Sequence, residues 1–189
     1  MIYLKLLRQS FLMMVFFTIL LGIIYPALIT GIGKLLFPFQ ANGSLIYNAQ
    51  NKVIASKIIG LNFPNNYFQS RPSANNYDAM NSGGSNLSIT SEKEINLVKA
   101  RINHAEALYG KDKKVPADLV FASGSGLDPD ISLEAAIYQA GYIAKVNHLA
   151  KKDVLDLINT KVDRNFFNLA TVNVLELNLA LNQLMNHRQ

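Results

Sequence analysis

The chain contains no cysteine in its 189 residues. It can therefore form no disulfide framework, and it offers no thiolate ligand for a metal and no cysteine nucleophile. A domain without disulfides must be held together by its hydrophobic core, and a chain of this length is long enough to bury one. The absence of cysteine thus excludes small disulfide-stapled folds and thiol enzymes.

Charge is missing from residues 11–33, which read FLMMVFFTILLGIIYPALITGIG. At about 1.5 Å per residue, a helix of this length reaches roughly 34 Å, which is enough to cross the core of a bilayer. A cleaved signal peptide also begins with a basic region, but its apolar run is shorter and ends in a small-x-small cleavage site. No such site ends this run. The sequence therefore predicts a retained transmembrane helix, which Pro26 is expected to kink.

This helix sets the predicted domain organisation. Residues 1–10 form a short cytoplasmic N-terminus, residues 11–33 cross the membrane, and residues 34–189 form one extracytoplasmic, or periplasmic, soluble domain. We therefore expect a single-pass protein of the plasma (inner) membrane.

The charges around the helix support this orientation and exclude one class of partner. Lys5 and Arg8 precede the helix and Lys34 follows it, so the positive-inside rule favours a cytoplasmic N-terminus. All thirteen acids follow Lys34, together with fifteen of the eighteen basic residues. The soluble domain is therefore nearly neutral and has no basic footprint for nucleic acid.

Sequence patterns beyond the helix predict strands and loops. Asn42-Gly43 predicts a turn, and residues 45–59 alternate loosely and are rich in β-branched residues, which indicates strands. Residues 62–87 have the Asn, Ser, Gly and Pro content of a loop. Residues 117–122, ADLVFA, form a short apolar run that predicts a buried strand.

Helices are predicted from capping residues and apolar spacing. Ser91 and Glu94 form a capping-box pattern at the start of one helix. Ser132 is the expected cap of a second, whose inward face comprises Leu133, Ile137, Ala140 and Ala144. Residues 151–162 predict a third helix, and Asn173 caps a fourth that runs towards the end of the chain. The predicted fold class is α+β: a single N-terminal transmembrane helix followed by one extracytoplasmic α+β domain.

The loop ASGSGLDP, residues 122–129, is the most distinctive local motif, but it fits no catalytic signature. A serine-hydrolase elbow needs Gly-x-Ser-x-Gly, and neither serine of the loop has a glycine two positions before it. The Gly-Ser-Gly of the loop could open a dinucleotide fingerprint, but Pro129 stands where the third glycine is required. We therefore interpret the loop as a turn between a strand and a helix.

No other pattern predicts a reaction centre. The three histidines are isolated, and Asp128 and Asp130 lack the further oxygen ligands of a calcium loop. Residues 81–85, NSGGS, match only loosely the signature of ABC ATPases. The sequence thus predicts no catalytic residue, no metal ligand and no autonomous enzymatic activity. A membrane-anchored extracytoplasmic enzyme, with an acid–base pair invisible in the linear sequence, and a scaffold of another system are the alternatives.

Several runs in a fixed order nevertheless carry a family resemblance over nearly the whole chain. They are YPALITGIGKLLFP, YFQSRPSANNYDAMNSGGSNL, VPADLVFASGSGLDPDIS and VNVLELNLAL. On these runs the chain resembles the KdpC family, the small accessory subunits of the bacterial potassium-transporting Kdp P-type ATPase. The resemblance implies a non-catalytic subunit of a high-affinity potassium uptake complex that is required for assembly and activity. It also implies a catalytic chaperone that raises the ATP affinity of the ATPase subunit.

The resemblance further implies partners. They are a potassium-channel-like subunit (KdpA-like), a P-type ATPase subunit (KdpB-like) and a small hydrophobic subunit (KdpF-like). In this setting we expect the glycine loop to form part of a docking interface, with Arg71, Ser82, Gly83, Gly84, Ser123, Gly124, Ser125, Gly126 and Asp128.

ATP adds a conflict, because it is cytoplasmic whereas the soluble domain is expected outside the membrane. We expect no bound cofactor on this chain and an effect on ATP affinity that passes through the assembled complex. The alternative is a direct nucleotide contact through Ser82, Gly83, Gly84 and Gln139.

Overall fold

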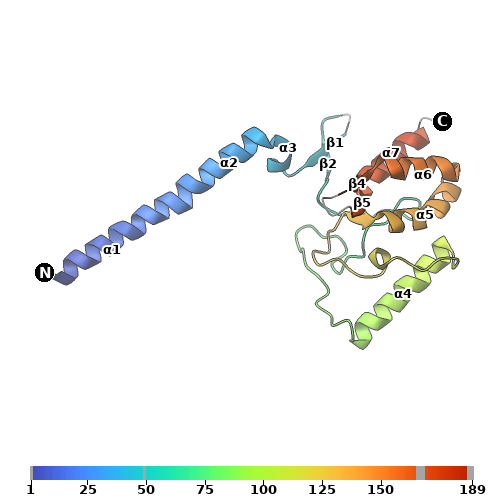
Figure 1. Cartoon of the computed structure of the whole chain (residues 1–189), viewed down its shortest axis with the longest axis horizontal. Coiled ribbons are helices and arrows are strands. Elements are labelled where there is room, and N and C mark those ends of the chain that lie inside the picture. Colours follow the sequence, from blue (N-terminus) through green and yellow to red (C-terminus); the bar gives the residue numbers. More distant parts are fainter. Residues whose placement is uncertain (1, 49, 165–168, 187–189) are drawn as a thin grey trace. The chain divides into compact units, whose positions relative to one another are not determined.

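The structure is a computed structural model that describes residues 2–48, 50–164 and 169–186. It divides into two compact units, residues 1–56 and 57–189. The first unit holds a long apolar helix and a β-hairpin, and the second holds several helices around a small antiparallel sheet (Figure 1). The predicted α+β class with one long N-terminal apolar helix is confirmed.

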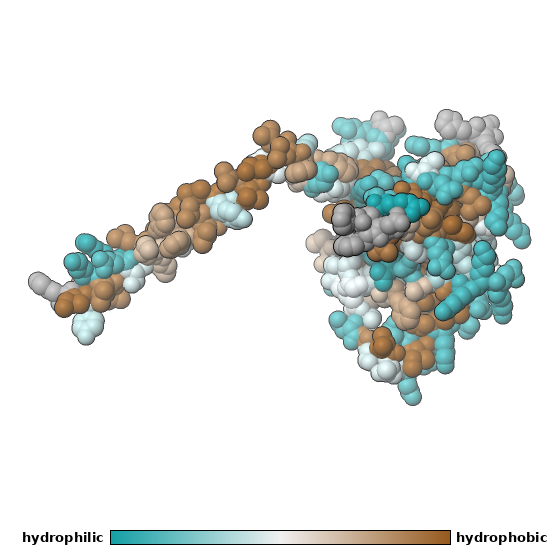
Figure 2. All heavy atoms as spheres, in the orientation of Figure 1, coloured by the Kyte–Doolittle hydropathy of each residue, from teal (hydrophilic) through white to brown (hydrophobic). Residues whose placement is uncertain are grey.

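One continuous helical stretch makes up most of the first unit. It consists of α1 (Ile2–Ile19), a π-helical turn η1 (Leu20–Ile24) and α2 (Tyr25–Leu36). Its most apolar window has a mean hydropathy of 2.5, and among the described residues it is the one helix long and apolar enough to cross a membrane. Figure 2 shows the apolar spheres along it. The π-helical turn ends two residues before Pro26, which lacks the N–H that would close the normal helical hydrogen bond.

A short hairpin completes the first unit. A one-turn helix α3 (Pro38–Ala41) leads into the predicted turn, where Gly43 has a φ of +83°. Strands β1 (Leu45–Tyr47) and β2 (Val53–Ser56) then pair antiparallel. The strands predicted in this region are thus confirmed, except that residues 57–59 form a turn instead.

The sheet of the second unit has three short antiparallel strands. They are β3 (Asp130–Ser132), β4 (Val162–Arg164) and β5 (Ala170–Asn173), with β5 in the centre. In this register Ile131 of β3 lies opposite Val172 of β5, and both are buried. The sheet therefore joins two chain segments that are about forty residues apart, counted from Ile131 to Val172 in the register.

Helices supply most of the core of the second unit. They are α4 (Glu92–Tyr109), α5 (Leu133–Val146), α6 (Lys151–Thr160) and α7 (Val174–Asn186), with a 3₁₀ turn η2 (Ala117–Leu119). Two of them, α5 and α7, pack on the sheet. Helix α5 contacts α4, α6 and the sheet, and α6 also packs on α7. Fully buried side chains from these helices form the centre of the core, among them Ile143, Val154, Ile158, Leu177 and Leu181. Burial of such side chains supplies the stability that no disulfide can.

Helix starts agree with the predicted caps. The side chains of Ser91, Ser132 and Asn173 each accept a hydrogen bond from the backbone N–H three residues later, at 3.2 Å in every case. The second half of the predicted capping box is not formed. The Ser91 N–H donates to the Ser88 carbonyl at 3.0 Å, so it does not bind the Glu94 carboxylate.

The strand predicted at residues 117–122 was wrong. This run forms η2 instead, because Pro116 opens a tight turn in which the Leu119 N–H donates to the Pro116 carbonyl at 3.1 Å. The turn buries Leu119 but leaves Phe121 41% exposed. The strand in this part of the chain is β3, which lies directly before the helix that the sequence predicts to start at Ser132.

The predicted inward face of α5 was only partly right. Ala140 and Ala144 are buried, but Ile137 is 38% exposed. The buried positions include Ala135, Ala136 and Ile143, because α5 packs against neighbours on more than one side. Small alanines permit this close approach, whereas a single apolar stripe is the pattern of a helix with one buried face.

Two buried side-chain amides hold an extended segment in the centre of the second unit. Asn178 of α7 accepts a hydrogen bond from the Phe68 N–H and donates one to the Phe68 carbonyl, both at 2.9 Å. Gln139 of α5 does the same for Gln69, at 2.7 and 3.2 Å. We call these four hydrogen bonds the amide clamp. It satisfies the backbone of two residues that no β-strand pairs, and Phe68 is fully buried beside it.

The amide clamp generates a stability prediction. Asn178→Leu leaves the buried N–H and carbonyl of Phe68 without partners, so we expect it to lower the free energy of unfolding by about 2–5 kcal/mol. Gln183→Leu, at an exposed position of the same helix, is the matched control and is expected to change it by less than about 0.5 kcal/mol. Urea unfolding of the full chain in detergent, followed by tyrosine near-UV circular dichroism, measures both. Equal effects of the two substitutions would contradict a structural role for the clamp.

Candidate functional site

The glycine loop, residues 122–129, lies between β3 and the turn η2 and is partly buried. Ser123, Gly126 and Leu127 are buried, whereas Gly124 and Ser125 are exposed. The loop therefore has an exposed tip, Gly124 and Ser125, and a buried base. This tip is the part of the motif that a partner could touch.

Backbone hydrogen bonds fix the loop to three distant segments. The Ser123 N–H donates to the Pro72 carbonyl at 3.1 Å, and the Ser125 carbonyl accepts from the Gly83 N–H at 2.8 Å. The Ser82 hydroxyl donates to that same carbonyl at 3.0 Å. On the other side, the Gly60 N–H donates to the Leu127 carbonyl at 2.7 Å. We call residues 71–85 and 122–128 together the loop cluster.

Glycine is required at two contacts within the loop cluster. Gly126 has a φ of +68°, and a Cβ there would lie 2.7 Å from the Gly83 carbonyl oxygen. A Cβ on Gly84 would lie 3.0 Å from the Gly124 carbonyl oxygen. At Gly124 itself, by contrast, no atom lies within 4 Å of where a Cβ would stand. Two of these glycines thus serve packing, while Gly124 faces open space.

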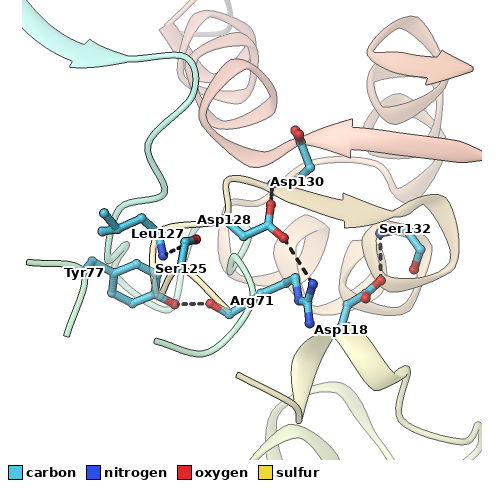
Figure 3. Close-up of polar contacts among 8 residues, drawn as sticks. All are labelled: Arg71, Tyr77, Asp118, Ser125, Leu127, Asp128, Asp130 and Ser132. Atoms are coloured by element: carbon cyan, nitrogen blue, oxygen red, sulfur yellow. Dashed lines mark hydrogen bonds and ion pairs between the residues drawn. The ribbon is translucent and has the colours of Figure 1, made fainter. Parts of the chain in front are cut away.

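An ion pair joins the two halves of the loop cluster. Arg71 Nη1 lies 3.1 Å from Asp128 Oδ2, and each side chain is about one-third exposed, at 30% and 31% (Figure 3). The other oxygen of Asp128 accepts from the Asp130 N–H at 3.0 Å. A partly exposed pair of this kind contributes about 0–1 kcal/mol. Its effect is therefore mainly to fix the relative position of the loops.

Tyr77 fixes the backbone of Arg71. Its hydroxyl donates to the Arg71 carbonyl at 2.7 Å (Figure 3). Burial raises the pKa of Tyr77 above its ordinary value of 10.0, and the nearby Arg101 lowers it by a smaller amount. The hydroxyl therefore keeps the proton that it donates at physiological pH.

Two further carboxylates organise the chain on the β3 side of the cluster. Asp118 Oδ2 accepts from the Ser132 N–H at 2.8 Å, and Asp130 Oδ1 accepts from the Asn173 side-chain amide at 2.9 Å. Burial raises the pKa of Asp130 above its ordinary value, and the hydrogen bond from Asn173 partly offsets this effect. Figure 3 shows Asp128 and Asp130 next to each other, whereas Asp118 reaches Ser132 from another segment.

Sequence reasoning missed the residues that fold the first loop of the cluster. The Ser73 hydroxyl accepts from the N–H groups of Asn75 and Tyr77, at 3.2 and 2.8 Å. The Asn75 side chain donates to the Asn81 carbonyl. Asn76 and Tyr77 both have positive φ, at 55° and 58°. The Ser-x-Asn-Asn order is a turn signal that could have located this loop.

The structure brings together all of the predicted interface residues but not the full predicted nucleotide set. Arg71, residues 82–84, residues 123–126 and Asp128 belong to one loop cluster. Gln139 is fully buried and is bonded to the backbone of Gln69 within the amide clamp. It therefore has no surface for a ligand in this conformation, and the direct nucleotide contact stays a prediction.

The two serines of the glycine loop make different contacts in the described part of the chain. The Ser125 hydroxyl accepts from the Leu127 N–H at 3.1 Å, and the buried Ser123 hydroxyl has no partner among the described residues. Neither serine is hydrogen-bonded to a histidine or a carboxylate in the described part of the chain. A nucleophile needs such a base within hydrogen-bond reach.

Comparison with known proteins identifies the family. The model of the family KdpC, described as K⁺-transporting ATPase, c chain, matches residues 7–183. The chain belongs to the KdpC family.

Similar relatives agree over almost their whole length. A protein of Serratia proteamaculans is 45% identical over 94% of this chain and 98% of its own. One of Acidobacterium capsulatum is 47% identical over the same shares, 94% and 98%. One of Caldanaerobacter subterraneus is 42% identical over 87% of this chain and 88% of its own. Each is named a potassium-transporting ATPase KdpC subunit. The family resemblance inferred from the sequence motifs is confirmed.

The two glycines at the tip and the base of the loop should respond differently to the same substitution. Gly126→Val places a β-branched residue at positive φ against the Gly83 carbonyl, so we expect a loss of roughly 2 kcal/mol or more in the free energy of unfolding. Gly124→Val points into open space and is expected to change it by less than about 0.5 kcal/mol. Urea unfolding of the two full-length variants makes the comparison. Similar losses in both would show that the tip is also packed.

Asp130 should make stability depend on pH in a defined direction. Burial raises its folded-state pKa above the ordinary value of 3.8, so the folded state binds the proton more tightly. The wild-type chain therefore loses stability as pH rises from the unfolded-state pKa through the folded-state pKa. Asp130→Asn removes this loss and keeps an acceptor for Asn173. We expect the variant to gain stability over the wild type at pH 7 relative to pH 3, measured by urea unfolding at both.

Asp112→Asn, on an exposed turn, is the control for the loss of one negative charge. A smaller advantage of Asp130→Asn at pH 7 than at pH 3 would mean that attraction between Asp130 and Lys57 outweighs burial.

Proposed function

We propose that this chain is the non-catalytic accessory subunit of a high-affinity, ATP-driven potassium uptake complex. Its partners in this proposal are the potassium-channel-like (KdpA-like), P-type ATPase (KdpB-like) and small hydrophobic (KdpF-like) subunits. Membership of the KdpC family supports the proposal, as do relatives that are named subunits of a potassium-transporting ATPase.

The loop cluster is the observation that carries the docking role. Its tip is exposed at Gly124 and Ser125, while its base is fixed by hydrogen bonds to Gly60, Pro72 and Gly83. Such a surface is already ordered before a partner arrives, which lowers the entropic cost of binding.

The N-terminal helix would anchor the chain in the membrane as a single pass. Its length and apolar composition suit a bilayer core. Lys5 and Arg8 lie near its start and Lys34 near its end, which favours a cytoplasmic N-terminus and an extracytoplasmic second unit. The proposed location is the plasma (inner) membrane.

An effect on ATP affinity would then be indirect. A domain outside the cytoplasm cannot reach ATP, so a chaperone effect requires two states of the complex that this chain stabilises unequally. The burial of Gln139 supports this reading over a direct contact. In this proposal ATP binds only to the ATPase subunit, and the isolated full chain in detergent should not bind ATP.

Assembly tests the proposal. The tagged full chain is purified in mild detergent from potassium-starved cells, and the co-purified subunits and potassium-stimulated ATPase activity are measured. We expect the wild-type chain to retain both large subunits. Gly124→Val should reduce their recovery at least tenfold, which corresponds to about 1.4 kcal/mol of weaker binding. Ala107→Val, at an exposed position of α4, is the matched control and should leave recovery unchanged.

The outcomes separate the two parts of the proposal. If the wild-type chain co-purifies with no ATPase subunit, the accessory role is wrong. If it assembles normally but Gly124→Val assembles equally well and is fully active, the loop tip is not the docking surface.

A further inference from the structure

A cavity of about 330 Å³ lies between α4 and the segment of residues 69–77. Leu97, Ala100 and Arg101 of α4 line one side, Ser70 and Pro72 line the other, and Leu119 of η2 also contributes. Its volume falls within the range of small-molecule sites, which is about 300–1,000 Å³. The loop tip at Gly124 and Ser125 does not line this cavity, although Pro72 and Tyr77 of the loop cluster do.

Ser70 gives the cavity an unused polar group. The residue is only 5% exposed, it lines the cavity, and its hydroxyl oxygen has no hydrogen-bond partner among the described residues. Buried polar groups are nearly always hydrogen-bonded, and an exception calls for a partner that comes from elsewhere. The hydroxyl oxygen itself is enclosed, so it can donate to an acceptor atom in the cavity only after the Ser70 side chain turns towards the cavity.

Arg101 gives the cavity a positive charge that pairs with no acid in the described part of the chain. Its Nη1 donates to the Val120 carbonyl at 2.9 Å, which holds the guanidinium in place. Among the described residues, no carboxylate lies within 4.0 Å of it. His104 also lines the cavity, and no Asp or Glu does. The guanidinium has five N–H donors, so it keeps donors available for an anion.

The remaining walls are largely apolar. Pro72, Leu97, Ala100, Ala105 and Leu119 contribute carbon surface beside the polar groups. Tyr77 and Tyr109 also line the cavity, but their hydroxyls are bonded to the Arg71 carbonyl and the Gln139 side chain. An occupant that matches these walls has one anionic end and an apolar body. A polyphosphate does not match them, because it would need several cationic partners where the cavity offers one arginine.

We propose that this cavity binds a small organic carboxylate with an aromatic or branched apolar body. Its carboxylate would pair with Arg101 and accept a hydrogen bond from the Ser70 hydroxyl, and its apolar body would lie against Leu97, Ala100 and Leu119. Because Ser70 and Pro72 flank Arg71 in the chain, the occupant would also stabilise the segment that carries the Arg71–Asp128 ion pair. The inference does not rest on the proposed function, since binding is measured on this chain alone.

The test uses ¹⁹F NMR with 4-fluorobenzoate as the probe and the full chain in lipid nanodiscs. Empty nanodiscs give the background of lipid binding. We expect saturable binding of 4-fluorobenzoate and at least tenfold weaker binding of its neutral analogue 4-fluorobenzamide. Arg101→Gln should weaken the binding of the acid at least tenfold, whereas Lys99→Gln, which removes a neighbouring exposed charge on α4, should leave it unchanged.

A second pair of variants covers the case in which Arg101→Gln does not fold. Ala100→Leu adds bulk to the α4 wall of the cavity without removing the hydrogen bond of Arg101 and should weaken binding at least tenfold. Asn103→Leu adds similar bulk at an exposed position of α4 that does not line the cavity, and it should bind like the wild type.

Three results would overturn the proposal. The first is no saturable binding to the wild-type chain. The second is equal binding of acid and amide, unaffected by Ala100→Leu, which indicates non-specific partitioning. The third is complete displacement of the probe by inorganic phosphate at equal concentration, which indicates a site for simple anions.

Discussion

The second unit depends on two buried amides that take the place of a β-strand. The segment around Phe68 and Gln69 crosses the core without a strand partner, so its backbone groups would be costly to bury. Asn178 and Gln139 each satisfy one residue at both its N–H and its carbonyl. Because these amides come from α7 and α5, the segment is fixed to two helices at once. The position of Arg71, two residues later, follows from this attachment.

The segment that carries Arg71 also fixes the position of the candidate interface. The ion pair with Asp128 and the hydrogen bond from Ser123 to Pro72 attach the glycine loop to the same segment. The carboxylates of this region hold loops together: Asp118 accepts from a backbone N–H and Asp128 pairs with an arginine. The cavity beside α4 shares the wall formed by Ser70 and Pro72. One extended segment therefore borders both surfaces to which we assign binding.

Local signals in the sequence predicted the elements that depend on local physics. The apolar helix, the caps at Ser91, Ser132 and Asn173 and the turn at Gly43 rest on hydrophobicity or on contacts three residues apart. Interactions between distant residues were not predictable in this way. The amide clamp pairs residues more than 60 positions apart. Strand β3 has no apolar alternation of its own, and it is a strand because it pairs with β5. The interface residues were grouped through family resemblance, and the hydrogen bonds that assemble them appear only in the fold.

Hydrogen exchange of the Phe68 and Gln69 amides tests the central claim, which is that the amide clamp fixes this segment as part of the core. The measurement uses the full chain in detergent, with exchange rates followed as urea is added. The account predicts that both amides exchange only through global unfolding, with the same opening free energy as buried amides of α5. Exchange as fast as that of the exposed loop residue Ala74 would contradict it, because the segment would then open independently of the helices that hold it.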